Sequence, residues 1–480
     1  MIRSLLGFFA AASALMLAAC ATIDSTPDAP AITGSDRAQA AQAHPQILQQ
    51  LGGAVEGPSA AYVASVGERI ATAAGVPGQC TFTLVNSDVP NAFAIPGCYI
   101  YVTRGIMALM NSEDELASVL GHEVGHVVAD HSARRQNTAT LSQLGAVLAG
   151  VLTGSGQIAQ AVGQAAQLYT LSYSRDQEFE SDDLGVRYLQ RAGYNPYASA
   201  DLLRSLGLQE SLSTRLANRD AASATPSWAR THPLSADRVA RARAQAQAAG
   251  AAPGGTERVE PYFAAIDGMI FGDDPEQGFV NGRTFSHPTL RIAFEAPQGF
   301  TLTNTPSAVL IGGPNNMRAQ FGAGALQSDL ATHASNGLRQ VLGNANAQVG
   351  QVQRSTTNGL ETATAIARAQ TQSGAVDVSV TAYRVGDRAY HFIALAPAGN
   401  LGAFSSMLRS MRTLTAQEAA ALRPRLIDIV QVRSGDTAQS LARRMAFDDY
   451  QLDRFLVLNG REANEQLRPG EQVKIVVYQR

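Results

Sequence analysis

The residues His122-Glu123-Val124-Gly125-His126 decide the fold of the first half of this chain. They follow Ser112-Glu113-Asp114-Glu115, which has the form of the capping box that opens a helix. Apolar residues recur at helical spacing around these segments, at Leu116, Val119, Leu120, Val124 and Val127. The pattern therefore predicts a helix. Because residues four apart share one face of a helix, the imidazoles of His122 and His126 can reach a single metal ion.

Two histidines at this spacing, with a glutamate after the first, are typical of a catalytic zinc site. Glu123 projects beside the two imidazoles and can take a proton from a zinc-bound water. The alternative is a surface helix that holds these residues by chance. With eight histidines in the chain, such a match is expected on the order of 0.01 times per sequence. The motif predicts one Zn²⁺ per chain and Glu123 as the general base. His131 lies off the ligand face and is expected to support a ligand or the structure.

A catalytic zinc ion needs a third protein ligand, and a second predicted helix offers candidates. This helix runs from about Arg175 to Ala192 and stops at Gly193. It carries Glu178 and Glu180, which lie about 200° apart around the helix axis, so only one of them can face the histidine pair. Asp182 is one turn beyond Glu178 and shares its face, where it can accept a hydrogen bond from a ligand histidine.

The segment Glu178-Phe179-Glu180-Ser181-Asp182 carries the most specific resemblance to a known family. Together with the first motif, it resembles the gluzincin metallopeptidases, which include the CaaX prenyl proteases, the HtpX-like membrane proteases and the BepA-like periplasmic proteases. In that family a Glu-aromatic-x-Ala-Asp segment follows His-Glu-x-x-His, and its first Glu binds zinc. Here Ser181 stands in place of Ala. The resemblance implies that His122, His126 and Glu178 are the metal ligands. It also implies an α-rich, zincin-like metalloprotease domain over residues 43–245.

Two further segments resemble the same family. Asn91-Ala92-Phe93 begins a segment similar to the family's Asn-Ala-Phe-Ala…Pro-Gly-Gly…Thr-x-Gly sequence, with Cys98 in place of a Gly. In zincin-like sites this strand flanks the cleft, and an extended substrate can add to its edge. Thr231-His232-Pro233 with Arg238 resembles the family's Ser/Thr-His-Pro-x-x-x-x-Arg element. His232 would then be catalytic, capping the zinc at rest or stabilising the oxyanion. The alternative is an exposed loop histidine.

The start of the chain is typical of an exported bacterial protein. Residues 1–19 combine a positive start with an uncharged apolar run, and Leu17-Ala18-Ala19-Cys20 resembles the lipobox. The resemblance implies a signal peptide, a lipid on Cys20 and a location in the periplasm, and Ala21 after the cysteine favours the outer membrane. An ordinary signal peptide with an incidental cysteine is the alternative. Residues 20–42, rich in Ala, Thr, Asp and Pro, are expected to form a flexible tether.

Cysteine usage and charge bear on the remaining properties. Cys80 and Cys98 each precede an apolar, β-rich segment, and an oxidising compartment permits a bridge between them. A disulfide and two free thiols are both possible, because the sequence does not show whether the segments are neighbours.

The formal net charge of −3 gives no global attraction to nucleic acid, so no such partner is expected. Glycines and glutamines interrupt Leu141–Tyr169, which is expected to be a loose helix or a lid rather than a bilayer span.

The second half of the chain predicts two further units after a linker at residues 246–279. Residues 280–415 contain short alternating runs and two helical stretches, which predict an α+β sandwich loosely similar to PsbP-type domains. Residues 427–478 resemble a LysM module, a small β-α-α-β fold that binds glycans containing N-acetylglucosamine. The turns that carry this resemblance are Gly435-Asp436-Thr437, Asn459-Gly460 and Pro469-Gly470. Peptidoglycan is the implied partner. Ala438 stands where the family has a more apolar residue, so a structural or protein-binding unit is the alternative.

These features together predict a multidomain, zinc-dependent endopeptidase that is lipid-anchored in the bacterial periplasm. By resemblance to the BepA-like branch, its substrates would be unfolded or misassembled envelope proteins, and its role would be protein quality control. A peptidoglycan-associated hydrolase is one alternative, prompted by residues 427–478. A non-catalytic, zinc-containing chaperone or scaffold is another, although a structural zinc site would have no need of Glu123 as a base.

Overall fold

The computed structural model describes residues 32–132, 173–220, 232 and 236–480, apart from positions 252, 254, 256, 327, 344, 372 and 373. The predicted signal peptide, Cys20 and the segment Leu141–Tyr169 lie outside the described residues, so those interpretations stay predictions. Within the described part of the chain, no helix is both long enough and apolar enough to cross a membrane.

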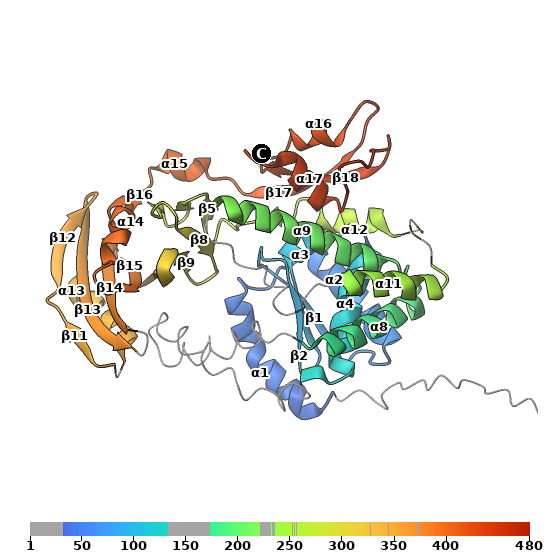
Figure 1. The fold of residues 1–480 in the computed structure, drawn as a ribbon, viewed down its shortest axis with the longest axis horizontal. Helices are drawn as coiled ribbons and strands as arrows, with labels where there is room; N and C mark the ends of the chain where they lie inside the picture. Colours follow the sequence, from blue (N-terminus) through green and yellow to red (C-terminus); the bar gives the residue numbers. More distant parts are fainter. Residues whose placement is uncertain are drawn as a thin grey trace, which may run out of the picture.

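The first part of the fold is a helical unit around a small sheet (Figure 1). Its elements are α1 (Gly34–Gln50), α2 (Pro58–Ala73), β1 (Thr81–Val85), β2 (Ala92–Ile95), β3 (Tyr99–Thr103), α3 (Arg104–Leu109), α4 (Glu113–Val128), α8 (Arg175–Arg191), α9 (Ala198–Asp220), α11 (Ala236–Ala248) and α12 (Val259–Ile266). The three-stranded sheet has the order β1-β3-β2. β1 runs parallel to β3 and β2 runs antiparallel to it, so β2 is an edge strand.

The two predicted helices of the motif form as expected and lie against each other. Ser112 caps α4 by accepting a hydrogen bond from the N–H of Glu115. The expected capping box is incomplete, because the Glu115 carboxylate accepts from the N–H of Asn111 instead. α4 and α8 approach closely at two glycines: a Cβ on Gly121 would lie 3.3 Å from the Cα of Gly185. This approach is what brings the side chains of the two helices to one point.

Two segments that were expected to lack structure are helical. α1 begins at Gly34, inside the expected tether at 20–42, and buries Ile47 in a cluster with Phe93 and Tyr101. α12 lies inside the expected linker at 246–279 and buries Tyr262, Phe263 and Ile266 in the main core. Composition misled the prediction, because a few apolar residues at helical spacing outweigh the small residues around them. The domain boundaries themselves stay predictions.

The middle part is rich in antiparallel strands, as predicted, and lies at one end of the molecule (Figure 1). Its elements are β5 (Phe279–Asn281), β6 (Thr284–His287), β7 (Ile292–Glu295), β8 (Thr301–Asn304), β9 (Val309–Gly312), β10 (Arg318–Ala325), α13 (Leu330–Leu342), β11 (Ala347–Val349), β12 (Gln353–Thr357), β13 (Leu360–Thr371), β14 (Gly374–Val385), β15 (Arg388–Pro397), α14 (Ser405–Ser410) and β16 (Arg412–Thr413). An eight-stranded sheet packs α13 on one face and a four-stranded sheet with α14 on the other. The PsbP-like resemblance stays a prediction.

The last part has the predicted order of elements, β17 (Arg425–Gln431), α16 (Ala438–Ala442), α17 (Gln451–Leu458) and β18 (Gln472–Tyr478). β17 and β18 pair antiparallel, and β17 also pairs with β4 (Ile270–Phe271). Its apolar side chains, among them Phe455 and Ile475, belong to the same core cluster as Met107 of α3. This C-terminal unit therefore packs onto the helical part instead of standing apart from it. The LysM resemblance stays a prediction.

A disulfide joins Cys80 and Cys98. The two cysteines precede β1 and β3, which run side by side with Thr81 opposite Tyr99. Of the two possibilities left open by the sequence, the structure forms the bridge.

Candidate metal centre

Four side chains from distant parts of the sequence converge on one point. His122 and His126 come from α4, Glu178 comes from α8, and His232 lies between segments outside the described residues. One nitrogen or carboxylate oxygen of each lies within 4.8 Å of the others. The Nε2 atoms of His122 and His126 are 3.0 Å apart, and each lies about 3.5 Å from a Glu178 oxygen, at 3.5 and 3.6 Å. Two imidazoles and a carboxylate converging in this way form the donor set that zinc takes in catalytic sites.

Burial and charge tune these groups for metal binding. Burial lowers the pKa of His126 well below its ordinary value, so the ring is neutral and can donate a lone pair. Burial would raise the pKa of Glu178, but His232 and His126 hold it well below its usual range. Glu178 is therefore an ionised carboxylate inside the protein, at 1% exposure. A buried anion facing the neutral His126 ring is a suitable environment for a cation.

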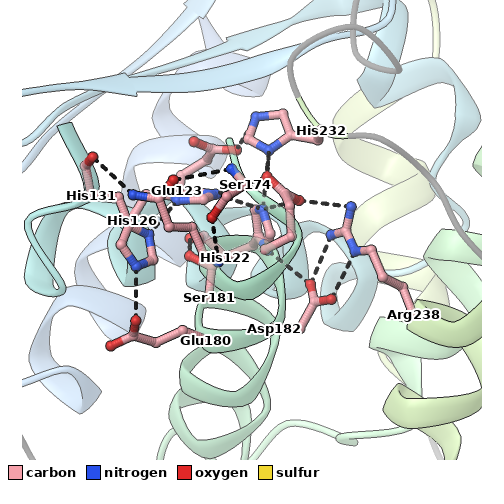
Figure 2. Close-up of polar contacts among 12 residues, drawn as sticks. His122, Glu123, His126, His131, Ser174, Glu180, Ser181, Asp182, His232 and Arg238 are labelled. Carbon is pink, nitrogen blue, oxygen red and sulfur yellow. Dashed lines mark hydrogen bonds and ion pairs between the residues drawn. The ribbon is translucent and has the colours of Figure 1, made fainter. Parts of the chain in front are cut away.

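Each of the two helix histidines is oriented by a second residue. His122 Nδ1 lies 3.0 Å from Asp182, and Arg238 donates two hydrogen bonds of 2.8 Å to the Asp182 carboxylate. Arg238 also lies 2.7 Å from Glu178. Figure 2 shows Arg238 forked onto Asp182 beside the cluster. A bidentate guanidinium–carboxylate pair fixes geometry, so Arg238 holds the groups from α8 that face α4.

The second histidine is oriented from the other side of α8. His126 Nδ1 and His131 Nδ1 are 2.7 Å apart, and His131 Nε2 lies 3.2 Å from Glu180. Glu180, the alternative third ligand, therefore points to His131 and keeps 40% of its side chain exposed. The Tyr173 ring stacks on His126 with 3.6 Å between ring centres. Of the two glutamates on α8, only Glu178 reaches the Nε2 atoms of the His122–His126 pair.

Ser181 ties the two ligand helices together. Its hydroxyl donates to the main-chain oxygen of His122 at 2.9 Å, and a Cβ on Gly125 would lie 2.9 Å from the same hydroxyl. Serine at this position is thus more than a tolerated replacement for Ala, because it adds an interhelical hydrogen bond at the site.

Glu123 and His232 face each other across the cluster. His232 Nε2 lies 3.6 Å from Glu123 and its Nδ1 lies 2.9 Å from Glu178. His232 is only 7% exposed, so the alternative of an exposed loop histidine is wrong. Despite burial, which would lower it, the pKa of His232 is raised by the charges of Glu178 and Glu123. The Oε2 atom of Glu123 has no hydrogen-bond partner among the described residues, and so is available to a water or a substrate.

A cleft opens beside Glu123. Apolar side chains line one wall, from three elements: Ile106 of α3, Val119 of α4, and Leu202, Leu203 and Leu206 of α9. Asn91 and Ala92 at the start of β2 also line the cleft. The Asn91 side chain is 1% exposed, and neither of its polar atoms finds a partner in the part of the chain that the structure describes. A second hollow, on the other side of His126, is lined by Ala94, Pro96 and Gly97 at the far end of β2.

The structure thus brings together most of the residues predicted from the sequence. His122, Glu123, His126, Glu178, Asp182 and His232 share one centre, and Asn91 and Ala92 border its cleft. Phe93 instead stacks on Tyr101, with 4.9 Å between ring centres. The roles of Arg238 toward Asp182 and of Glu180 toward His131 were missed. For Arg238 the sequence did carry a signal: its spacing after His232 matches the Ser/Thr-His-Pro-x-x-x-x-Arg element.

Comparison with known proteins agrees with this geometry. Residues 58–246 match the family described as Peptidase family M48. The beta-barrel assembly-enhancing protease of Yersinia pestis is 33% identical over 195 residues, covering 38% of this chain and 38% of the relative. That of Escherichia coli strain K12 is 32% identical with the same coverage. Mitochondrial metalloendopeptidase OMA1 of Schizosaccharomyces pombe is 31% identical over 185 residues, covering 38% of this chain and 51% of that protein.

The family match covers residues 58–246. The matches span 38% of the length of the Yersinia and Escherichia relatives. Among solved structures, cyanobacterial PsbP from Synechocystis covers 30% of this chain and 98% of its own, with a TM-score of 0.23 and 11% identity. A similarity at that score carries no argument about the fold, so the fold of the middle part is described from its own strand pairing.

Proposed function

Since residues 58–246 carry the pattern of Peptidase family M48, we propose that this chain is a zinc-dependent endopeptidase. One observation carries the proposal: His122, His126 and Glu178 meet at one point, with Glu123 beside them, on the border of a cleft. A zinc ion held by those three ligands would polarise a peptide carbonyl and acidify a bound water. The supporting pairs Asp182–Arg238 and His131–Glu180 account for the orientation of both imidazoles.

The protein's own groups divide the remaining work. Glu123 takes the proton of the attacking water and returns it to the leaving amine. The His232 imidazole lies 3.6 Å from Glu123 and is raised in pKa, so it can donate a hydrogen bond to the carbonyl oxygen as that atom becomes an oxyanion. Alternatively it covers the metal ligands at rest, because its Nδ1 lies 2.9 Å from Glu178.

The substrate is proposed to bind as an extended strand on the edge of β2. β2 pairs on one side with β3, and its other side borders the two hollows that flank the histidines. A peptide strand added there makes main-chain hydrogen bonds that are independent of sequence. The buried, unpartnered amide of Asn91 supplies a further donor and acceptor, since such groups are costly unless a ligand satisfies them. The apolar wall of Leu202, Leu203 and Leu206 favours a large apolar side chain next to the scissile bond.

Location and substrates follow from the relatives and from the cysteines. We propose that the chain is periplasmic and anchored through a lipid on Cys20, to the outer membrane. The Cys80–Cys98 disulfide supports an oxidising compartment. Relatives named beta-barrel assembly-enhancing proteases support unfolded or misassembled envelope proteins as substrates. Peptidoglycan hydrolysis is a weaker proposal, supported only by the β-α-α-β order of the C-terminal unit.

The test is Glu123→Gln, which preserves shape and removes the base. Zinc content and folding should be unchanged, while cleavage of casein falls at least about a hundredfold, the scale of lost acid–base catalysis. Release of muropeptides from purified peptidoglycan is measured in parallel. Cleavage near the parent level with zinc retained would reject Glu123 as the base. Muropeptide release without casein cleavage would favour the peptidoglycan hydrolase, and zinc binding without either activity would favour the scaffold.

A further inference from the structure

The chain contains 36 arginines but only one lysine, Lys474. This lysine lies on β18 of the C-terminal unit, and it is fully buried, at 0% exposure. Removing an ammonium group from water is costly unless its protons find acceptors. Its surroundings must therefore provide specific partners, and those partners identify what it does.

The partners of Lys474 belong to the peptidase part. Its Nζ donates to the main-chain oxygens of Ala108, at 2.7 Å, and Met110. These residues end α3, where the last carbonyls of a helix lack partners within the helix and carry the negative end of its dipole. Nζ also lies 5.9 Å from the centre of the Phe263 ring of α12. Lys474 thus caps α3 from a position 364 residues beyond Met110.

The backbone of Lys474 is fixed as firmly as its side chain. The Asn459 side chain accepts from its N–H at 2.8 Å and donates to its oxygen at 2.9 Å. Burial lowers the pKa of Lys474 to about 7, against the opposing charge of Glu115 on α4. A compact ammonium suits two converging carbonyls, whereas the planar fork of an arginine is built for a carboxylate or phosphate.

The other end of α3 holds the substrate strand. Thr103 caps the first turn of α3 by accepting from the N–H of Ile106. The same hydroxyl donates to the main-chain oxygen of Asn91 at 2.9 Å and accepts from its N–H at 3.0 Å. Between the two caps, Ile106 lines the cleft. α3 is therefore a short helix held at both ends, with Lys474 at one end and the border of the cleft at the other.

A second contact of the C-terminal unit reaches the cleft through α9. Gly460 packs so closely against α9 that a Cβ would lie 2.7 Å from the Ser205 hydroxyl and 3.1 Å from the Asn111 side chain. Ser205 lies between Leu203 and Leu206, which line the cleft from the same helix. Figure 1 shows the C-terminal α17 beside α9. The unit thus supports both helices that shape the apolar wall.

We propose that Lys474 is a positioning residue for the peptidase cleft: by capping α3 it sets Ile106 and Asn91 against α9, and so sets the selectivity for an apolar side chain. The C-terminal unit is then a part of the peptidase. This inference rests on the proposed endopeptidase function, but the burial of the cap can be tested without it.

The first test uses the single lysine of the full chain as a probe. An amine-reactive N-hydroxysuccinimide ester is added to the native protein and to the urea-unfolded protein, and modification of Lys474 is followed by mass spectrometry of its peptide. A closed cap predicts native labelling at least about a hundredfold slower than in urea, since modification requires local opening. Equal rates would overturn the proposal whether or not the protein cleaves peptides.

The second test compares two variants of the same interface. Lys474→Met keeps the length of the side chain and removes the donors. Asp453→Asn removes an ion pair with Arg215 of α9. The Arg215 side chain is 51% exposed and the Asp453 side chain 34% exposed, and ion pairs this exposed contribute little to stability. Both variants are assayed on two peptides that differ only in Leu or Ala at the residue next to the scissile bond.

In Lys474→Met the ratio of kcat/KM for the Leu peptide to that for the Ala peptide should fall about tenfold, mainly through KM. This is the scale of one or two methylenes in an apolar pocket. Bound zinc should stay unchanged, and Asp453→Asn should behave as the parent protein. An equal loss on both peptides would show a purely structural role and overturn the proposal, as would an unchanged preference. If Lys474→Met does not fold, the labelling rate of the parent protein decides. If the parent cleaves neither peptide, the proposed function fails while the labelling test stands.

Discussion

The third metal ligand can be identified by changing three carboxylates that lie on one helix. Glu178, Glu180 and Asp182 all belong to α8, but they differ in what they contact. Glu178 is 1% exposed and faces both ligand histidines. Asp182 contacts His122 at 3.0 Å. Glu180 contacts His131 at 3.2 Å, and 40% of its side chain is exposed. Replacing each by Ala should therefore give a graded loss of zinc affinity.

The magnitudes follow from these contacts. Loss of a residue that orients a ligand histidine costs about 10- to 100-fold in metal affinity, so this range is expected for Asp182→Ala. In the Glu180–His131 contact the carboxylate is 40% exposed, so water screens the charge and the contact contributes at most about 1 kcal/mol, which is less than tenfold. Glu178→Ala removes a donor atom and leaves two imidazoles, so its loss should exceed that of Asp182→Ala. Folding should survive in Glu178→Ala, because Arg238 keeps both hydrogen bonds to Asp182.

Zinc retained after dialysis against a chelator of graded concentration measures the affinities, and circular dichroism checks the fold. Glu180→Ala is the matched control, since it removes the same group from the same helix. Peptidase activity is then measured at saturating zinc, where Glu180→Ala should recover and Glu178→Ala should not. If Glu180→Ala loses the metal while Glu178→Ala keeps it, the assignment of Glu178 is wrong.

Three further outcomes test the cleft, the anchor and the bridge. Leu203→Ala should enlarge the apolar wall and shift cleavage toward aromatic side chains, as read by mass spectrometry of a peptide library; an unchanged profile would place the specificity pocket elsewhere. Cys20→Ala should move the protein from membranes to the soluble periplasmic fraction, whereas sedimentation with membranes in high salt would show another anchor. Replacing Cys80 and Cys98 by Ser opens a loop with a separation of 18 residues and should lower the free energy of unfolding by about 3 kcal/mol in urea titrations; no change would mean that the bridge is not formed in solution.

What the sequence predicted well was local. His122 and His126 lie one turn apart, so their common face follows from helix geometry alone. Helix α8 was predictable from Ser174 to Gly193, and its N-cap is a complete capping box. The β-rich segments after Cys80 and Cys98 also formed as expected, because alternating β-branched and aromatic residues favour strands.

What the sequence could not give was the pairing of distant residues. Arg238 binds Asp182 across 56 positions, and Lys474 reaches Met110 across 364. Neither residue has a local pattern that names its partner. The helical period showed that only one of Glu178 and Glu180 could face the histidine pair, but the contact of Glu180 with His131 depends on how α4 ends, which the period does not specify. α12 was missed because Tyr262, Phe263 and Ile266 span barely one turn.

The substrate strand explains why so many constraints gather on one short part of the chain. In the proposed binding mode a peptide adds to the edge of β2 that β3 does not pair, and an edge strand gains no hydrogen bonds on that side before a peptide binds. Its position therefore depends on neighbouring contacts. The Cys80–Cys98 bridge closes the loop that contains β2, and Thr103 holds the backbone of Asn91 at its start. α1 packs in the same apolar cluster as Phe93.

Lys474 extends this support to the C-terminal unit, because it caps the helix whose first residue follows Thr103. Four elements that are separate in sequence thus fix one strand relative to the metal ligands on α4. A peptide bound to a strand held in this way meets Glu123 and the ligand histidines at a defined distance, which is what efficient attack on its carbonyl requires. The rigid edge of β2 is therefore where the selectivity of the proposed peptidase should be sought.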